Sequence, residues 1–275
     1  MDEPHPEPTA RARSSLAGLV RFLVIVAVGA WVLRSFIVAA FSIPTGSMLP
    51  TMLPGDYLFV TKWNTGYSSA SFPWQVPRFK GRIFERLPER GDIVVFKRPD
   101  AEGADWVKRV IGLPGDLVEV RGGQLVMNGV PVPRVAIDPV TIPQSPNIPC
   151  RVPDGAVREV IDVAGTPTCR YRAFRETLPA GPDYTVLDQV DSGPGDWFGP
   201  YRVPAGRLFL MGDNRDDSAD SRFTLASGGI GPVPTDRVVG RATRIFWSTD
   251  GTADLARPWT WLTALRGDRL GQGYE

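Results

Sequence analysis

The stretch WVKRVIGLPGD, residues 106–116, is an apolar run that ends in a proline and glycine turn signal. Its short length and the glycine and proline that close it predict a β-strand followed by a turn. Because side chains alternate between the two faces of a strand, Trp106, Lys108 and Val110 share one face and Arg109 lies on the other. With adjacent cations on opposite faces, we expect one of them to point into the protein.

Similar short apolar runs lie on both sides of this stretch, separated by turn signals. Gly122-Gly123 stands between two of them and is typical of a two-residue hairpin. After the N-terminal region no helical period exceeds three turns, and no internal repeat is present. The predicted fold class is therefore mainly β. The predicted strands cover residues 57–63, 92–97, 106–113, 117–121, 124–127, 207–211 and 238–247.

Residues 130–204 interrupt this pattern of strands. They are rich in proline, contain both cysteines of the chain, and separate two groups of clean strands. We therefore predict one β domain made of residues 38–129 and 205–255, with 130–204 as an inserted subdomain. The remaining segments are a disordered cytoplasmic tail at 1–15, a membrane anchor at 16–37 and a C-terminal tail at 256–275.

The anchor is predicted from residues 16–33, which are apolar except for Arg21. As a helix they would span about 27 Å, close to the hydrocarbon thickness of a bilayer. Arg21 lies one turn inside, so its side chain can reach the interface. Two arginines and the terminal amine precede the segment and only Arg34 follows it directly. This bias predicts a single-pass protein with its N-terminus in the cytoplasm and its body outside.

A cleaved secretory signal is the alternative to an anchor. The apolar core between the arginines, residues 22–33, has the length of such a signal, and Val38-Ala39-Ala40 offers a small-residue cleavage site. Both interpretations export the body of the protein. Outside the cytoplasm a disulfide between Cys150 and Cys169 is possible, with two free thiols as the alternative.

The composition excludes several kinds of site. The net charge is +1, from 31 Lys+Arg and 30 Asp+Glu, and gives no indication of a nucleic-acid partner. The single histidine, His5, lies in the N-terminal tail, so the body lacks a Ser-His-Asp triad, a Cys-His pair and a histidine zinc site. No P-loop or GxGxxG motif is present. Arginine stays protonated, so a neutral amine base must be one of four lysines: Lys62, Lys80, Lys97 and Lys108.

After these exclusions, a catalytic serine paired with a lysine base remains possible. Residues 43–51, IPTGSMLPT, form a turn with Ser47 at its apex, although an ordinary polar turn leaving the bilayer has the same pattern. A lysine base near neutral pH needs a pKa of about 7–8 instead of about 10.4, and burial among apolar neighbours would lower that of Lys108. A lysine whose amine reaches solvent is the alternative. The other three lysines are expected on the surface.

A third polar segment follows a predicted strand, namely residues 211–222, MGDNRDDSADSR. A calcium loop is disfavoured because the glycine and the glutamate of an EF-hand are missing. Asp220 and Arg222 can pair and hold the loop, and the hydroxyl of Ser218 can orient a lysine.

Together and in this order, these segments resemble the motifs of type I signal peptidases, the membrane enzymes that remove secretory signal peptides. The resemblance runs from the anchor to about residue 247, apart from the inserted region. Thr45 stands where some relatives have serine, which keeps the hydroxyl. The matching motifs are TGSMxPT at 45–51, GDIVVF at 91–96, KRxxGLPGD at 108–116 and GDNRxxSxDSR at 212–222.

The resemblance implies a signal-peptidase-like β catalytic domain whose apolar surface enters the bilayer, with no cofactor and no metal. It implies cleavage of secretory preproteins after Ala-x-Ala in the cell membrane, and it leaves a contact with the export machinery open. Neutral Lys108 would take the proton of the nucleophile Ser47. The remaining roles are the Thr45 hydroxyl and the Ser47 N–H as oxyanion hole, Ser218 as orienting residue, and Asp213, Asp220 and Arg222 as structural residues.

Two other functions stay open at this stage. Asp191-Ser192-Gly193 resembles an aspartic protease motif, but those enzymes need two carboxylates that share a proton, and the chain has no second Asp-Ser/Thr-Gly. The second of these functions is protein binding by a non-enzymatic β module that is tethered to the membrane.

Overall fold

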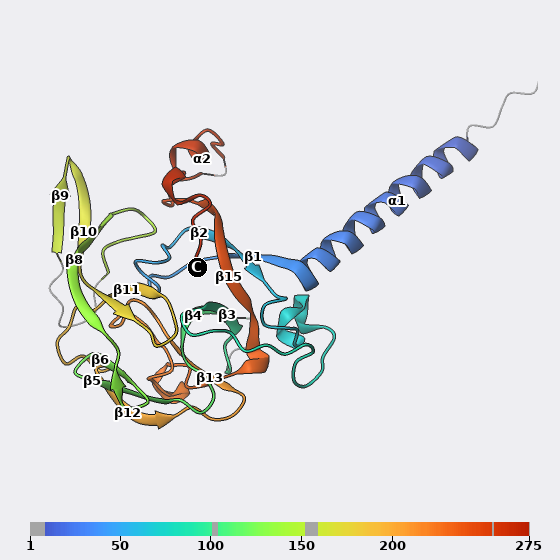
Figure 1. The fold of residues 1–275 in the computed structure, drawn as a ribbon. Helices are drawn as coiled ribbons and strands as arrows, with labels where there is room; N and C mark the ends of the chain where they lie inside the picture. Colours follow the sequence, from blue (N-terminus) through green and yellow to red (C-terminus); the bar gives the residue numbers. More distant parts are fainter. Residues whose placement is uncertain (1–8, 101–103, 152–158, 255, 275) are drawn as a thin grey trace, which may run out of the picture.

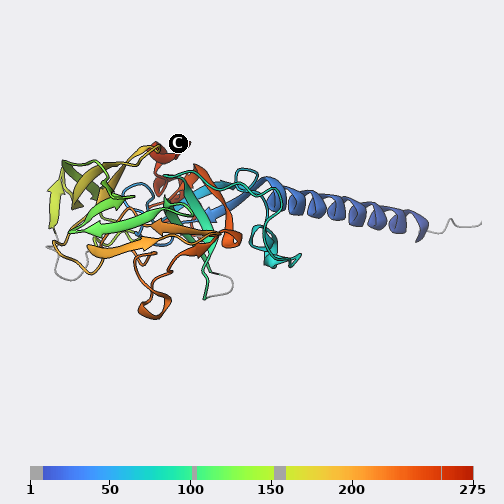
Figure 2. The same ribbon diagram turned by 60° about the horizontal axis from the view of Figure 1, so that its bottom comes forward.

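The structure is a computed structural model that describes residues 9–100, 104–151, 159–254 and 256–274. A single long helix, α1 (Thr9–Val32), stands apart from a β-rich body (Figures 1 and 2) and continues as the π-helix η1 (Leu33–Ile37). Residues Leu16–Ile37 are long and apolar enough to cross a membrane. The helix begins at Thr9, so the prediction of a disordered tail was wrong over 9–15, where alanine and arginine favour helix.

The body is built on a seven-stranded antiparallel sheet, which confirms the prediction of a mainly β fold. Its faces are covered by separate apolar clusters, one around Leu58, Val60 and Met48 and the other around Phe96 and Val110. In order across the sheet the strands are β1 (Val38–Ser42), β2 (Asp56–Thr61), β15 (Val238–Ser248), β3 (Ile93–Lys97), β4 (Asp105–Gly112), β13 (Arg207–Met211) and β14 (Val233–Pro234).

A second sheet contains the predicted hairpin. Gly122 and Gly123 both have positive φ, 55° and 77°, as the tight turn between its two strands requires. The order is β12 (Trp197–Arg202), β5 (Leu117–Arg121), β6 (Gln124–Met127) and β7 (Val130–Pro131). Strand β12 thus returns from residues beyond 190 to pair with β5. The proposed domain boundaries at 130 and 204 stay a prediction.

A third sheet lies within residues 130–204 and carries the disulfide. It has the order β11 (Asp183–Leu187), β10 (Thr166–Thr177) and β8 (Arg134–Pro143), with β9 (Glu159–Val163) also paired to β10. Cys150 and Cys169 are bonded, with their Cα atoms 5.3 Å apart, so the pairing that the sequence left open is present. Both are buried in a cluster that includes Leu49 and Leu53 of the main domain. The disulfide therefore lies where this sheet meets the segment after Ser47.

Short helices complete the body, and the C-terminal segment packs against it. Arg269 is buried and its Nη2 donates to Oδ2 of the fully buried Asp56 at 2.6 Å and to the carbonyl of Thr51 at 3.1 Å. The C-terminal segment therefore braces the turn that carries Ser47. These helices are η2 (Ser69–Ser71), η3 (Pro73–Gln75), η4 (Leu225–Ser227), η5 (Thr235–Arg237), α2 (Thr260–Thr263) and η6 (Gly267–Arg269).

The end of β13 touches the turn between β1 and β2. The N–H of Asn214 donates to the carbonyl of Ser47 at 3.1 Å, and its side-chain amide donates to the carbonyl of Gly46 at 3.1 Å. Gly212 allows this approach, because a Cβ there would lie 2.5 Å from the Ser47 carbonyl oxygen and 2.2 Å from Oγ of Ser218. Two segments that are more than 160 residues apart in sequence thus form one site.

Candidate active site

The structure brings Ser47 and Lys108 together. Nζ of Lys108 lies 2.7 Å from Oγ of Ser47 and also donates to the carbonyl of Val107 at 3.1 Å. The lysine comes from the middle of β4, where the alternation of the strand directs it, and only 3% of it is exposed. The serine comes from the turn after β1 and is half-buried. A hydroxyl and an amine in this contact can exchange a proton directly.

Burial changes the chemistry of Lys108. Desolvation of its ammonium lowers its pKa from 10.5 to about 8, although the carboxylates of Asp220 and Asp213 act in the opposite direction. A pKa of about 8 leaves a useful fraction of neutral amine near neutral pH, as a general base requires. The value agrees with the range expected from the sequence.

Arg109, the second cation of this strand, is also buried, so the expectation that one of the two points inward was too narrow. Its guanidinium makes two parallel hydrogen bonds to Asp213, Nε to Oδ1 at 2.8 Å and Nη2 to Oδ2 at 2.6 Å. The hydroxyl of Thr51 donates to the same carboxylate at 2.5 Å. This buried pair joins β4, the last motif and the segment after Ser47, because Asp213 of that motif contacts both Arg109 and Thr51.

The loop after β13 is held by a second buried pair. Arg222 binds Asp220 through Nε and Nη2, both at 2.9 Å, and neither residue is exposed by more than 7%. Burial alone would raise the pKa of Asp220, but the Arg222 guanidinium and the N–H of Gly212 lower it below its ordinary value. The carboxylate stays charged and accepts from Gly212 at 3.1 Å. The pairing predicted between Asp220 and Arg222 is therefore present in the structure.

Sequence reasoning missed another buried pair in this loop. Arg215 donates to Glu176 at 2.5 Å and to the Tyr184 hydroxyl at 3.0 Å, and these three residues are buried. Glu176 belongs to β10 and Tyr184 to β11, so the pair ties the loop to the third sheet. The motif at 212–222 contains Arg215 but gives no signal for its partner, which lies about 40 residues away in the proline-rich region.

Ser218 and Thr45 both line the cleft that holds Ser47 and Lys108, but Ser218 makes no hydrogen bond to Lys108 in the structure. Oγ of Ser218 is buried and has no hydrogen-bond partner within the described residues. The Lys108 ammonium has three protons and donates two of them, to Ser47 and to the carbonyl of Val107, so Ser218 stays a prediction as its orienting residue. Thr45 is exposed at the edge of the cleft.

The cleft around the dyad has a volume of about 830 Å³. Residues 41–47 form one wall and residues 105–108 of β4 form another. Residues 215–219 contribute from the last motif, and 146–149 contribute from beside the disulfide. A cleft of this volume has the size of a ligand-binding site.

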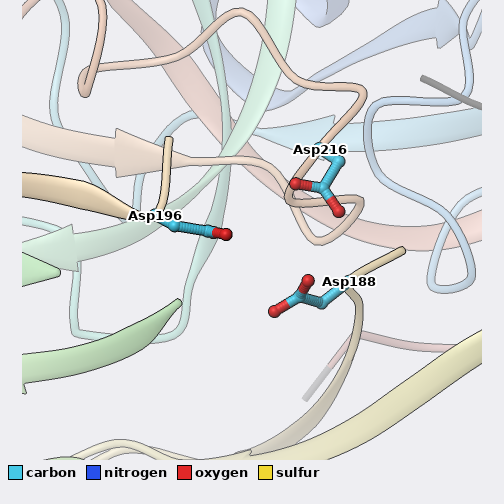
Figure 3. A group of neighbouring side chains, drawn as sticks. All are labelled: Asp188, Asp196 and Asp216. Atoms are coloured by element: carbon cyan, nitrogen blue, oxygen red, sulfur yellow. The ribbon is translucent and has the colours of Figure 1, made fainter. Parts of the chain in front are cut away.

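Three carboxylates lie close together at the loop after β13, those of Asp188, Asp196 and Asp216 (Figure 3). One oxygen of each carboxylate lies within 4.8 Å of those of the other two. Each carboxylate already has a hydrogen-bond donor or a cation of the protein as its partner. Asp216 accepts from two backbone N–H groups, Asp196 accepts from that of Gly193 at 2.7 Å, and Asp188 pairs with Arg134. We assign the cluster to the packing of the loop, because these donors are the partners that buried carboxylates require.

The aspartic protease alternative has no support in the geometry. The Asp191 side chain is 88% exposed and pairs with Arg172 at 2.8 Å. A carboxylate that acts in a proton-sharing dyad must face a second carboxylate in a cleft. Asp191 instead lies in solvent beside a cation.

Comparison with known proteins gives one consistent result. The family model for signal peptidase, peptidase S26, matches residues 16–247. Signal peptidase I of Rickettsia typhi is 37% identical over 228 residues, which cover 80% of this chain and 76% of the relative. Signal peptidase I of Rickettsia rickettsii is 36% identical over 243 residues, which cover 84% and 79% of the two chains.

A crystal structure of a signal peptidase I from Enterococcus faecalis covers 57% of this chain and 97% of its own, with 25% identity and a TM-score of 0.28. The family match spans more than four fifths of the chain and includes the segments that carry Ser47, Lys108 and Ser218. The resemblance noted in the sequence is therefore confirmed. The chain belongs to the peptidase S26 family of signal peptidases.

Proposed function

We propose that this chain is a membrane-anchored serine endopeptidase that removes signal peptides from exported preproteins with Ser47 as nucleophile and Lys108 as base. One observation carries the proposal. The buried amine of Lys108 lies 2.7 Å from the hydroxyl of Ser47, and burial lowers its pKa to about 8. The chain offers no histidine in its body that could act instead. The names of the relatives support the class of substrate.

The reaction has two halves. Neutral Lys108 takes the proton of Ser47 as Oγ attacks the scissile carbonyl carbon. The tetrahedral intermediate collapses, the peptide C–N bond breaks, and Lys108 gives its proton to the leaving amine. A water molecule then attacks the acyl-enzyme with Lys108 again as base, and the carboxylate product leaves with Ser47 restored.

The developing oxyanion needs donors on the nucleophile turn. The N–H of Ser47 donates to no acceptor among the described residues, so it is available for the substrate oxygen. We assign the second donor to the hydroxyl of Thr45, two residues earlier and exposed in the same cleft. Donors that are already in place stabilise the charge without reorganisation at the moment of reaction.

The walls of the cleft fit the expected preference for small residues before the cut. Apolar side chains from β1, the turn after it, β3 and β4 line part of it, namely Phe41, Ile43, Val95 and Val107. This apolar part of the wall favours apolar substrate side chains over charged ones, because a charge placed against it would lose its hydration. This supports the Ala-x-Ala specificity of the family as a proposal for this chain.

The membrane location is supported by two features. Leu16–Ile37 provides the span. Strands β2 and β15 expose aromatic side chains that pack on one another, with the rings of Phe59 and Phe246 4.4 Å apart and Tyr57 6.2 Å from Phe246. Exposed aromatic clusters suit the interface of a bilayer. The charge bias around the span supports a cytoplasmic N-terminus.

Substitution of Ser47 tests the function itself. Ser47→Ala should abolish cleavage of a model preprotein while its thermal unfolding stays near that of the wild type, because a half-buried turn serine contributes little packing. Asp191→Asn is the matched control and should cleave normally. Full activity of Ser47→Ala would contradict the serine mechanism, and a dead Asp191→Asn would support an aspartic one. A wild-type chain that cleaves nothing would support the binding-module alternative.

Substitution of Lys108 tests the base. Activity should rise with pH with a midpoint near 8, because the neutral amine gains population as pH passes the lowered pKa. Lys108→Arg should lose activity as completely as Lys108→Ala, since a guanidinium keeps its proton. The exposed Lys80 provides the control, and Lys80→Arg should retain both the rate and the pH profile. An active Lys108→Arg enzyme would show that another group is the base.

Substitution of Thr45 tests the oxyanion hole. Thr45→Val is nearly isosteric but removes the donor, so kcat should fall by about 10²–10³-fold with little change in KM. Thr45→Ser should stay active because it keeps the hydroxyl. If kcat of Thr45→Val equals that of the wild type, backbone N–H groups alone hold the oxyanion.

A further inference from the structure

Lys62 is the second buried lysine of the chain and has no role in the mechanism. Only 2% of it is exposed, so the expectation that it is a surface lysine was wrong. Its Nζ donates to the carbonyl of Arg34 at 2.5 Å and to that of Ser71. No carboxylate forms an ion pair with it within the described residues. Desolvation therefore lowers its pKa to about 8, with Arg34 acting in the same direction.

The contacts of Lys62 belong to a wider cap on the end of the membrane span. The last carbonyls of a helix lack partners within the helix and carry its partial negative charge. Here the body supplies those partners. Besides the bond from Lys62 to the Arg34 carbonyl, the Tyr67 hydroxyl donates to the Phe36 carbonyl at 2.9 Å, and the Lys62 N–H donates to the Ile37 carbonyl at 3.4 Å.

Aromatic packing reinforces this junction. The ring of Phe36 lies 5.5 Å from that of Tyr67 and 5.3 Å from that of Phe72, and Trp31 contacts it from one turn earlier at 6.1 Å. Ser35 is fully buried beside it in sequence. Such packing, together with the hydrogen-bonded carbonyls, indicates a rigid junction, because the backbone groups of a flexible linker would be hydrogen-bonded to water.

We propose that Lys62 is a positioning residue that locks the membrane span to the catalytic domain and so holds the cleft at a fixed place relative to the bilayer. The ammonium joins the span end to η2, since Arg34 belongs to the span and Ser71 to η2. This inference rests on the proposed function, in which the substrate is held in the same bilayer. A rigid joint keeps the scissile bond and the dyad aligned, whereas a loose one spreads the cleft over many orientations.

The test compares two substrates with the full chain in lipid vesicles. One is a preprotein inserted in the same vesicles, and the other is a short soluble peptide with the same cleavage sequence. Lys62→Met keeps the length of the side chain but removes the ammonium. We expect its kcat/KM for the preprotein, relative to the peptide, to fall by about tenfold. The exposed Lys80, in the same region of the chain, serves as control, and Lys80→Met should leave the ratio unchanged.

An unchanged ratio in Lys62→Met would overturn the inference. If Lys62→Met loses peptide cleavage as well, Tyr67→Phe decides, because it keeps the ring against Phe36 and removes one cap on the span. Its ratio should fall severalfold, and an unchanged ratio would then overturn the inference. A wild-type chain that cleaves neither substrate would overturn the proposed function, and this inference with it. Distances between spin labels on α1 and on the catalytic domain should broaden in Lys62→Met, and a distribution as narrow as in the wild type would contradict a loosened joint.

Discussion

The contact between the buried amine of Lys108 and the hydroxyl of Ser47 is the constraint on which the rest of the site depends. A lysine ordinarily keeps its proton at neutral pH, so the protein must make the ammonium unfavourable by about 3 kcal/mol for a pKa near 8. It does so by placing Lys108 in the centre of a sheet, under the turn that carries Ser47. That burial requires a second segment to close over the dyad.

The closing segment is the loop after β13, and buried ion pairs hold it in place. Asp213 binds Arg109 from the strand that carries Lys108, and Asp220 binds Arg222 within the loop. Removing one partner of such a pair would leave an unpaired charge inside the protein, which is strongly destabilising. The carboxylates also raise the pKa of Lys108, against the effect of burial. The site therefore balances two requirements, a loop held firmly by charges and an amine that is easily deprotonated.

The strands and the hairpin could be predicted because their signals are local, whereas the pairing of Ser47 with Lys108 was predicted by elimination and by the family resemblance. Alternation in residues 106–113 places Lys108 and Arg109 on opposite faces of the strand without deciding which one points inward, and the scarcity of lysine and histidine leaves few candidates for a base. The buried positions of Arg109, Arg215 and Lys62 could not be predicted in the same way. Their partners lie 104, 39 and 28 residues away in sequence. Without knowledge of a buried partner, a cationic residue is predicted to lie on the surface. The helix start at Thr9 was missed because a charged, proline-containing tail resembles disorder.

A direct titration of Lys108 tests the central claim without using activity. Lysine labelled with ¹³C at Cε gives four signals in this chain, one for each lysine, and the spectrum of Lys108→Arg identifies the signal of Lys108. With the full chain in detergent micelles, that signal should move with pH through a midpoint near 8, because burial disfavours the ammonium. A midpoint near the ordinary value of 10.5 would show that Lys108 remains protonated at working pH, and it would contradict the account of this site.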